Sequence, residues 1–244
     1  MPAPRQSRRF LTLLLVSALL CGCGGSSSMT STPTPTPQPG TSNLRVVSGN
    51  ASEGSINVIV DGAPVASDVT FLKNTGYVSV PAGSHLLTLQ GWVNPSNNSF
   101  MANFPENGKS TLLFEGWGPF SSGSSVIADD TTSTATGNFK LRIVDTTGSV
   151  SFDVYVLPAG TPPGGTPTFS PVTVSENSPS QYLSLPAGDY HVVFTDFQTL
   201  NVELDTGPLT FSAGQNRTLL LINNCALHTC DFRAFTSMML SDLN

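Results

Sequence analysis

Residues 77–83 read Tyr-Val-Ser-Val-Pro-Ala-Gly, and residues 182–188 repeat the pattern as Tyr-Leu-Ser-Leu-Pro-Ala-Gly. In both stretches apolar and polar side chains alternate before the Pro-Ala-Gly triplet, and alternation at period two is typical of a strand that is buried on one face. Proline and glycine favour turns, so each triplet is predicted to form a hairpin turn between two strands. The pattern therefore predicts that the same β structure occurs twice in the chain.

Four further segments recur in the same order along the chain. The pairs are 44–47 with 141–144, 55–60 with 151–156, 69–71 with 172–174, and 111–114 with 218–221. Ordered self-similarity of this kind indicates a tandem duplication. We expect repeat 1 at 43–130, a polar linker at 131–138 and repeat 2 at 139–244, each repeat folding separately. A Pro/Gly-rich insertion between Leu157 and Phe169 accounts for most of the extra length of repeat 2.

The composition agrees with β structure. Charged residues make up only 11% of the chain, against about 25% in an average protein, and no stretch shows a convincing helical period with caps. Short strands separated by frequent turns over about 100 residues are typical of a sandwich. The predicted fold is all-β, with two tandem antiparallel β-sandwiches.

The repeated segments carry recognisable motifs. They include Leu-Arg-Val-Val at 44–47, Asn-Val-Ile-Val-Asp-Gly at 57–62, Phe-Asp-Val-Tyr-Val-Leu-Pro-Ala-Gly at 152–160 and Gly-Pro-Leu-Thr-Phe-Ser-Ala-Gly at 207–214. These resemble the strand and turn motifs of a widespread bacterial domain of unknown function. The resemblance covers nearly all of the chain after the leader and is more specific in repeat 2, because repeat 1 lacks the Gly-Pro-Leu-Thr segment. It implies an immunoglobulin-like or transthyretin-like sandwich on a surface lipoprotein, and it brings no catalytic residues.

The N-terminus has the features of a targeting segment. Three arginines precede an apolar run at 10–20, which is shorter than the roughly 20 residues that span a bilayer. Residues 1–22 are therefore predicted to be a signal peptide. Residues 20–23, Leu-Cys-Gly-Cys, resemble a lipobox, which predicts lipidation of Cys23; the alternative is an ordinary secretory signal with incidental cysteines. Gly24 in place of Asp favours the outer membrane over the inner one if the host is Gram-negative.

The segment that follows is predicted to be a tether. Residues 23–42 are rich in Gly, Ser, Thr and Pro, a composition that forms extended linkers and no core. Without residues 1–22 the chain has 7 basic and 16 acidic residues, a net charge of −9. Such a charge repels nucleic acid, so the expected partners are the membrane, through the anchor, and an unknown protein or glycan.

The remaining chemistry-bearing residues are few. Cys225 and Cys230 flank Ala-Leu-His-Thr, and in an oxidising compartment they are expected to form a disulfide that contributes about 2 kcal/mol; a metal site with His228 is the rival reading. No metal or cofactor is expected. The histidines fall at non-equivalent positions of the two repeats, which argues against a duplicated active site.

Several residues are predicted to face solvent. Asp129 and Asp130 are expected to be solvated edge residues near the repeat boundary, because two adjacent acids lack the spacing of a calcium loop. His191 and Thr195 are expected to face outward. Trp117 and Phe120 form a candidate binding loop, with capping of the core as the alternative.

The sequence contains no motif of a known catalytic or nucleotide-binding site. We therefore expect a non-catalytic lipoprotein of the cell envelope that acts in surface adhesion or recognition. A structural spacer in an envelope assembly is the alternative, and an enzyme with an unfamiliar site is a third.

Overall fold

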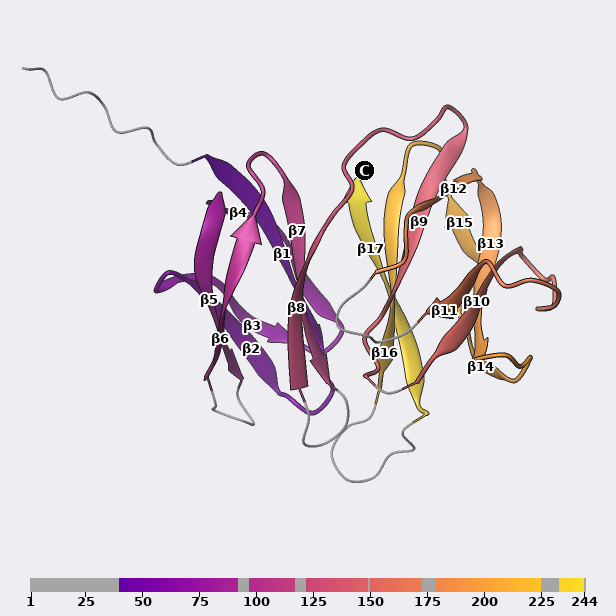
Figure 1. The fold of residues 1–244 in the computed structure, drawn as a ribbon, viewed down its shortest axis with the longest axis horizontal. Coiled ribbons are helices and arrows are strands. Elements are labelled where there is room, and N and C mark those ends of the chain that lie inside the picture. The colour runs from indigo at the N-terminus through magenta and orange to yellow at the C-terminus, as the bar shows by residue number, and fades with distance from the viewer. Residues whose placement is uncertain are drawn as a thin grey trace, which may run out of the picture. The chain divides into compact units, whose positions relative to one another are not determined.

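The computed structural model describes residues 40–91, 97–116, 122–148, 150–172, 179–224 and 233–243. Every regular element in these ranges is a β-strand (Figure 1), which confirms the predicted all-β class. None of the described residues belongs to a helix that is long and apolar enough to cross a membrane. All of the described residues belong to one compact unit, Gln38–Asn244.

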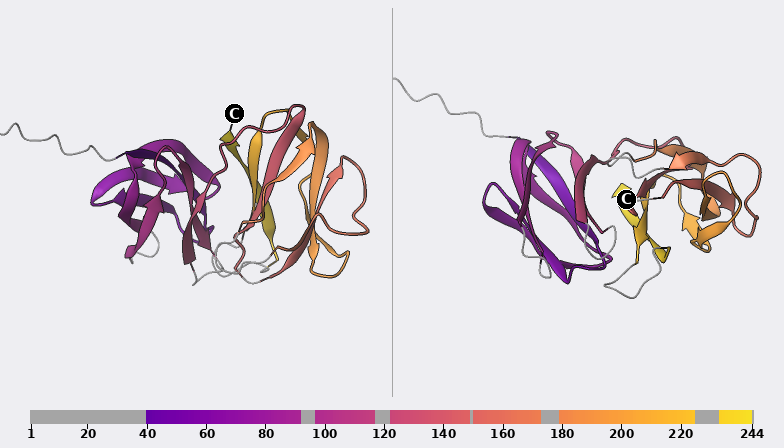
Figure 2. Two further views of the ribbon diagram at one scale, coloured as in Figure 1. Left: turned by 45° about the horizontal axis from the view of Figure 1, so that its top comes forward. Right: turned by 60° about the horizontal axis from the view of Figure 1, so that its bottom comes forward.

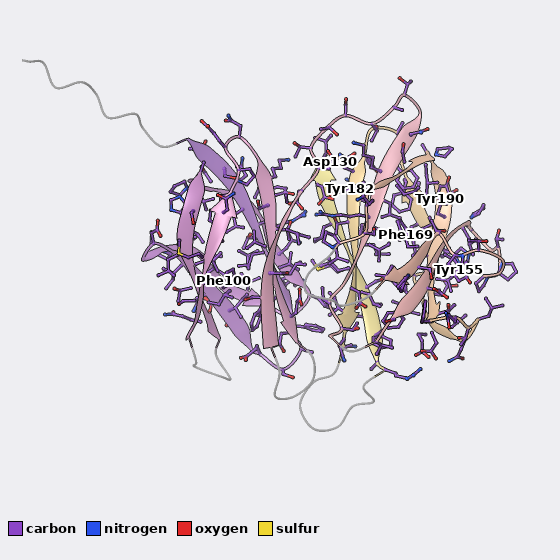
Figure 3. The ribbon with its side chains drawn as sticks, in the orientation of Figure 1. Phe100, Asp130, Tyr155, Phe169, Tyr182 and Tyr190 are labelled. Atoms are coloured by element: carbon purple, nitrogen blue, oxygen red, sulfur yellow. The ribbon has the colours of Figure 1, made fainter. Side chains whose placement is uncertain are left out.

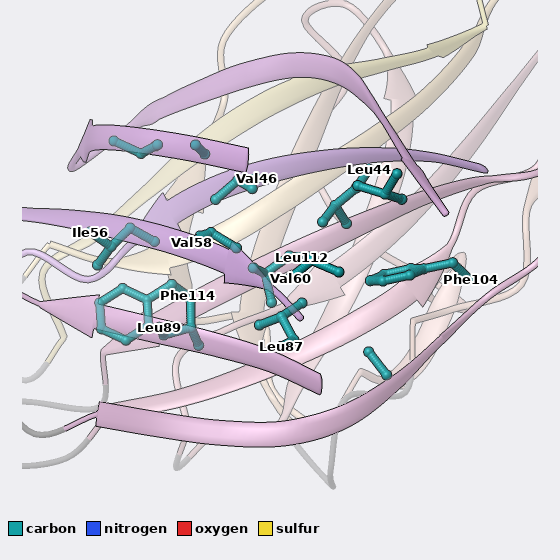
Figure 4. Close-up of a cluster of buried hydrophobic side chains, with 14 residues drawn as sticks. Leu44, Val46, Ile56, Val58, Val60, Leu87, Leu89, Phe104, Leu112 and Phe114 are labelled. Atoms are coloured by element: carbon teal, nitrogen blue, oxygen red, sulfur yellow. The ribbon is translucent and has the colours of Figure 1, made fainter. Parts of the chain in front are cut away.

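The first sandwich has two four-stranded sheets. Sheet A has the strand order β4-β1-β7-β8, and sheet B has the order β3-β2-β5-β6. The strands are β1 (Thr41–Gly49), β2 (Ser55–Val60), β3 (Ala63–Thr70), β4 (Lys73–Pro81), β5 (Gly83–Gly91), β6 (Asn97–Phe104), β7 (Lys109–Gly116) and β8 (Ser122–Ala128). Alternate residues of the two sheets meet in one apolar cluster, to which β1 contributes Leu44 and Val46 and β2 contributes Ile56, Val58 and Val60 (Figure 4).

The second sandwich follows the same plan. Sheet C has the order β12-β9-β16-β17, and sheet D has the order β11-β10-β13-β14, with β15 paired to β13. The strands are β9 (Asn138–Asp145), β10 (Phe152–Pro158), β11 (Phe169–Val172), β12 (Leu183–Pro186), β13 (Gly188–Asp196), β14 (Val202–Asp205), β15 (Leu209–Phe211), β16 (Asn216–Asn223) and β17 (Phe235–Leu243). Figure 2 shows the two facing layers of each sandwich from other directions.

Corresponding strands hold corresponding places in the two sandwiches. The pairs are antiparallel except for β1 with β7 and β9 with β16, which are parallel. Phe139 stacks on Phe211 at a centroid distance of 4.2 Å inside the second sandwich, whose core includes residues from both sheet C and sheet D.

The prediction of a hairpin at each Pro-Ala-Gly triplet is wrong. Pro81 ends β4 in sheet A and Gly83 begins β5 in sheet B, so the triplet carries the chain from one sheet to the other. The second triplet does the same between β12 in sheet C and β13 in sheet D. Alternation and turn residues locate two strands and the turn between them, but they do not show whether those strands pair with each other or face each other.

The two central strands of sheet A and the two central strands of sheet C are buried on both faces. β1, β7, β9 and β16 carry nearly continuous runs of buried residues, because a third apolar cluster joins sheet A to sheet C. Its members are Val47, Leu113, Ile127, Val144, Leu220, Ile222 and Leu240. The two sandwiches therefore share apolar contacts, and separate folding of each repeat stays a prediction.

Candidate functional site

Two arginines lie beside the apolar cluster that sheets A and C share. Arg45 on β1 and Arg142 on β9 are the arginines of the repeated Leu-Arg motif, and their side chains are only 3% and 2% exposed. Each arginine contacts a threonine of its own sandwich. Arg45 Nε donates to Thr111 Oγ1 at 3.0 Å, and Arg142 Nε donates to Thr218 Oγ1 at 2.7 Å. Neighbouring strands therefore hold the two guanidinium groups in matching positions.

Each arginine also reaches the other sandwich. Arg45 donates from Nη1 to the carbonyl oxygen of Ser241 at 2.8 Å and from Nη2 to Asp242 Oδ1 at 2.6 Å. Arg142 donates from Nη1 to the carbonyl oxygen of Ala128 at 2.7 Å and from Nη2 to Asp129. The contacts are reciprocal, so the two sandwiches exchange equivalent hydrogen bonds.

Two tyrosines complete the network. Tyr77 donates its hydroxyl to Asp129 Oδ2 at 2.7 Å, and Tyr182 donates its hydroxyl to Asp242 Oδ2 at 2.8 Å. The ring of Tyr77 lies 4.8 Å from Arg45 Cζ, and that of Tyr182 lies 4.7 Å from Arg142 Cζ. Burial raises the pKa of both tyrosine hydroxyls above the usual value, so both remain donors to the carboxylates at any physiological pH.

The prediction that Asp129 is a solvated edge residue is wrong. Its side chain is fully buried, and it accepts hydrogen bonds from Thr111, Tyr77 and Arg142. Asp130, beside Tyr182 in Figure 3, keeps a quarter of its side chain exposed and pairs with Lys140 Nζ at 2.7 Å. The two acids differ because Asp129 faces the second sandwich.

The outer face of sheet D is covered by the insertion of repeat 2. Residues on this face of β10 and β13 are buried, with Tyr155 3%, Val193 1% and Thr195 0% exposed. The insertion returns to the sheet at Thr168, which accepts a bond from Val156 N–H and donates its own N–H to Val154 O. On the corresponding face of sheet B, by contrast, Leu86 is 45% exposed.

His191 fastens the insertion to this face, so the prediction that His191 and Thr195 face solvent is wrong. His191 is 7% exposed; its Nδ1 lies 3.1 Å from both oxygens of Asp205, and its Nε2 lies 2.8 Å from the carbonyl oxygen of Thr161. The sequence places both residues on the outer face correctly, but it does not show that a loop covers that face.

His85 has similar surroundings in the first sandwich. Its Nδ1 lies 2.5 Å from Asp61 Oδ2, and its Nε2 lies 3.1 Å from the carbonyl oxygen of Ala82. The hydrogen bond to Asp61, together with that to Ala82, raises the pKa of His85. The two histidines are therefore fixed by an aspartate on one side and a main-chain carbonyl on the other.

Three cavities are lined by the second sandwich alone. The proline cavity, of about 390 Å³, lies beside His191 and Asp205 and is lined by Pro162, Pro163 and Pro208. The tyrosine cavity, of about 500 Å³, is lined by Asp153, Tyr155, Gly165, Pro167, Gln198, Thr199 and Leu200. A third, of about 350 Å³, lies between 169–172 and 179–181. The insertion lines the first two, so it creates hollows that the bare sheet lacks.

The loop between β13 and β14 borders the tyrosine cavity. Asp153 accepts a hydrogen bond from Gln198 N–H at 2.8 Å and another from the hydroxyl of Ser170. Asn201 donates to Asp196 at 3.0 Å. Although these bonds hold the loop, two of its large apolar side chains are exposed, Phe197 at 38% and Leu200 at 58%, and so is Val202 at the start of β14, at 48%.

The site residues predicted from the sequence lie outside the described residues. These are Cys23, Cys225, Cys230, Trp117 and Phe120, together with His228 of the rival metal reading. Within the described ranges, no group of three or more His, Cys, Asp or Glu side chains is arranged to hold a metal ion. The arginine–aspartate network was missed, although one signal pointed to it: a charged residue inside an apolar run of both repeats must be paired if the run is buried.

A comparison with curated proteins finds no match. A family model does match the chain, from the second residue of β1 to the middle of β10. The match covers the first sandwich from Ser42 onward, then β9 and the first part of β10. A domain of the family described as Domain of unknown function (DUF4397) is thus found at residues 42–155.

Proposed function

We propose that this protein is a non-catalytic lipoprotein of the cell envelope, and that its second sandwich is a recognition module. One observation carries the proposal: the insertion of repeat 2 covers the outer face of sheet D and forms cavities there. Binding sites are usually concave and built from loops on a rigid scaffold. The partner is a protein or glycan that binds at this face.

The proposed localisation in the cell envelope rests on the N-terminal sequence. A signal peptide at 1–22 and a lipidated Cys23 would place the protein on a membrane, in the outer membrane if the host is Gram-negative. Two or more acyl chains give stable anchoring. The tether at 23–42 would then separate the folded part from the lipid surface.

A tandem duplication explains the architecture. Support comes from the equal strand order of the two sandwiches and from the reciprocal bonds of Arg45 and Arg142. Under this proposal the repeats are 43–130 and 139–244, and the linker at 131–138 joins two copies that pair face to face. The insertion is then the main difference between the copies.

The surroundings of the histidines support a non-catalytic role. A histidine that activates a nucleophile keeps one ring nitrogen in contact with it. In both His85 and His191, Nδ1 contacts an aspartate and Nε2 contacts a main-chain carbonyl. Both ring nitrogens of each histidine therefore contact other parts of the protein and hold one segment against another, which is a structural role.

The spacer function remains a second candidate, because the arginine–aspartate network would hold the two sandwiches in a fixed arrangement. A pull-down of the tagged full chain from intact cells separates the two functions. Recognition predicts an extracellular partner that is lost when residues 159–168 are replaced by a short Gly-Ser turn. As a control, Leu86→Ser and Met101→Ser change the outer face of sheet B and should keep the partner. Capture of envelope proteins alone, independent of the insertion, would favour the spacer.

The lipid anchor has its own test. Palmitate labelling should be lost in Cys23→Ser and kept in Cys21→Ser, because only Cys23 follows a small residue in the lipobox frame. Labelling that survives Cys23→Ser would reject the proposed anchor.

A further inference from the structure

We propose that the tyrosine cavity binds a neutral sugar ring, so that the recognised partner is a glycan. The inference rests on the proposed recognition function and assigns its ligand class. The cavity of about 500 Å³ falls within the range of about 300–1,000 Å³ that is usual for small-ligand sites.

Tyr155 supplies the first polar group. It lies on β10 (Figure 3) and is 3% exposed, yet it lines the cavity, and none of the described residues hydrogen-bonds to its hydroxyl. Because a tyrosine hydroxyl both donates and accepts, it suits a sugar hydroxyl, which does the same.

Gln198, from the loop between β13 and β14, and Asp153, from β10, supply further polar groups. The carboxylate of Asp153 is tied to Gln198 N–H and to Ser170, which fixes the position of the loop at the cavity rim. The side chain of Gln198 is exposed and lines the cavity, and its amide has two donors and one acceptor oxygen. Tyr155 and Gln198 therefore line one space, and their side chains together offer both donors and acceptors.

The other lining residues are mostly apolar. Leu200 is 58% exposed, Gly165 and Pro167 come from the insertion, and Thr199 adds one more hydroxyl. A pyranose has hydroxyls around its edge and C–H groups on its faces, so it needs both polar and apolar walls. The loop is hydrogen-bonded before any ligand arrives, which lowers the entropic cost of binding.

The local charge selects a neutral sugar. Asp153 lines the cavity, and Asp196 and Glu203 near the loop share the single cation of Arg233. The chain after residue 22 has a net charge of −9. A uronic or sialic acid would be repelled by these carboxylates, whereas a neutral hexose would not.

The test uses the full chain, purified in mild detergent, and a panel of oligosaccharides. The neutral probes are cellotetraose, maltotetraose, mannotetraose, chitotetraose and lactose, and 3′-sialyllactose is the anionic probe. Binding is measured by titration calorimetry. We expect at least one neutral probe to bind and the sialylated one to bind more weakly than lactose.

The variant Tyr155→Phe removes only the hydroxyl, so it should weaken binding by roughly two- to tenfold, the loss expected for one neutral hydrogen bond. Gln198→Ala should act similarly. Tyr190→Phe is the matched control, because the hydroxyl of Tyr190 donates to Pro186 O at 2.9 Å outside the cavity; its affinity should stay unchanged. Melting curves of all three variants show whether the fold is kept.

Three results would overturn the inference in distinguishable ways. Binding that Tyr155→Phe leaves unchanged would show that the sugar binds elsewhere. Binding to no probe, with a protein partner captured through residues 159–168, would leave the recognition function in place and reject the ligand class. Binding to no probe and capture of no partner would reject both.

Discussion

Removal of the Asp242 carboxylate should destabilise the protein far more than removal of an exposed acid. Asp242 is 1% exposed and accepts three hydrogen bonds, from Arg45 Nη2 at 2.6 Å, Thr218 Oγ1 at 2.6 Å and Tyr182 OH at 2.8 Å. In Asp242→Ala these three donors lose this acceptor, although Arg45 Nη2 still donates to Thr111 Oγ1 at 2.7 Å. The buried guanidinium of Arg45 then keeps only one carboxylate, that of Asp129 at 3.5 Å.

The expected cost follows from the balance of two effects. Hydrogen bonds to a charged group contribute about 1.5–3 kcal/mol each, but the variant no longer has to remove a carboxylate from water. Truncation of one partner of a buried ion pair costs about 3–5 kcal/mol, and we expect a value in that range. Total stability of a domain is only about 5–15 kcal/mol, so the change should be easy to measure.

Urea unfolding followed by far-UV circular dichroism measures the effect. The matched control is Asp130→Ala, which removes the partly exposed pair with Lys140 and should cost about 1 kcal/mol or less. The double variant Arg45→Met with Asp242→Leu should cost less than the sum of its single changes, because it leaves no unpaired charge. If Asp242→Ala costs no more than the control, the network does not stabilise the pairing of the sandwiches.

Three further outcomes follow from the structure. Burial raises the pKa of Asp145 to about 7, so between about pH 4 and pH 7 the folded state holds a proton that the unfolded state releases, and the free energy of unfolding should fall as the pH rises through this range. The variant Asp145→Asn should remove this fall and be more stable than the unchanged protein above pH 7 by on the order of 2–4 kcal/mol, as measured by urea unfolding at several pH values. Because the pKa of His85 is raised, its ring should titrate in NMR spectra above the usual value of 6.5, and its stabilising contribution should be lost as the pH rises through that pKa. An unchanged titration midpoint in Asp61→Asn would contradict the hydrogen bond to Asp61 as the cause of the raised pKa. The isolated repeat 139–244 exposes the side of the shared cluster formed by Val144, Leu220 and Ile222, so light scattering should detect self-association; a stable monomer would show that the shared interface is dispensable.

The sequence locates strands well where a local pattern determines them. The predicted segment 55–60 coincides with β2 (Ser55–Val60), and the repeated blocks fall on strands of equal place in the two sandwiches. What it misses depends on contacts between distant segments. Arg45 and Asp242 are 197 residues apart, and no local pattern shows that their strands meet. For the same reason, a continuous apolar run such as 111–114 is compatible with burial on one face or on both.

The same distinction separates the scaffold from the candidate binding site. The repeated Leu-Arg and Tyr-x-Ser-x motifs supply Arg45, Arg142, Tyr77 and Tyr182, and all four side chains serve the contact between the sandwiches. Residues occupied in this way are not available to a ligand. The proposed ligand site lies instead in a segment that the two repeats do not share, the insertion that lines the tyrosine cavity. The motifs then explain how the two sandwiches pair, whereas the proposed binding function rests on a different part of the chain, as is common for functional sites on a shared fold.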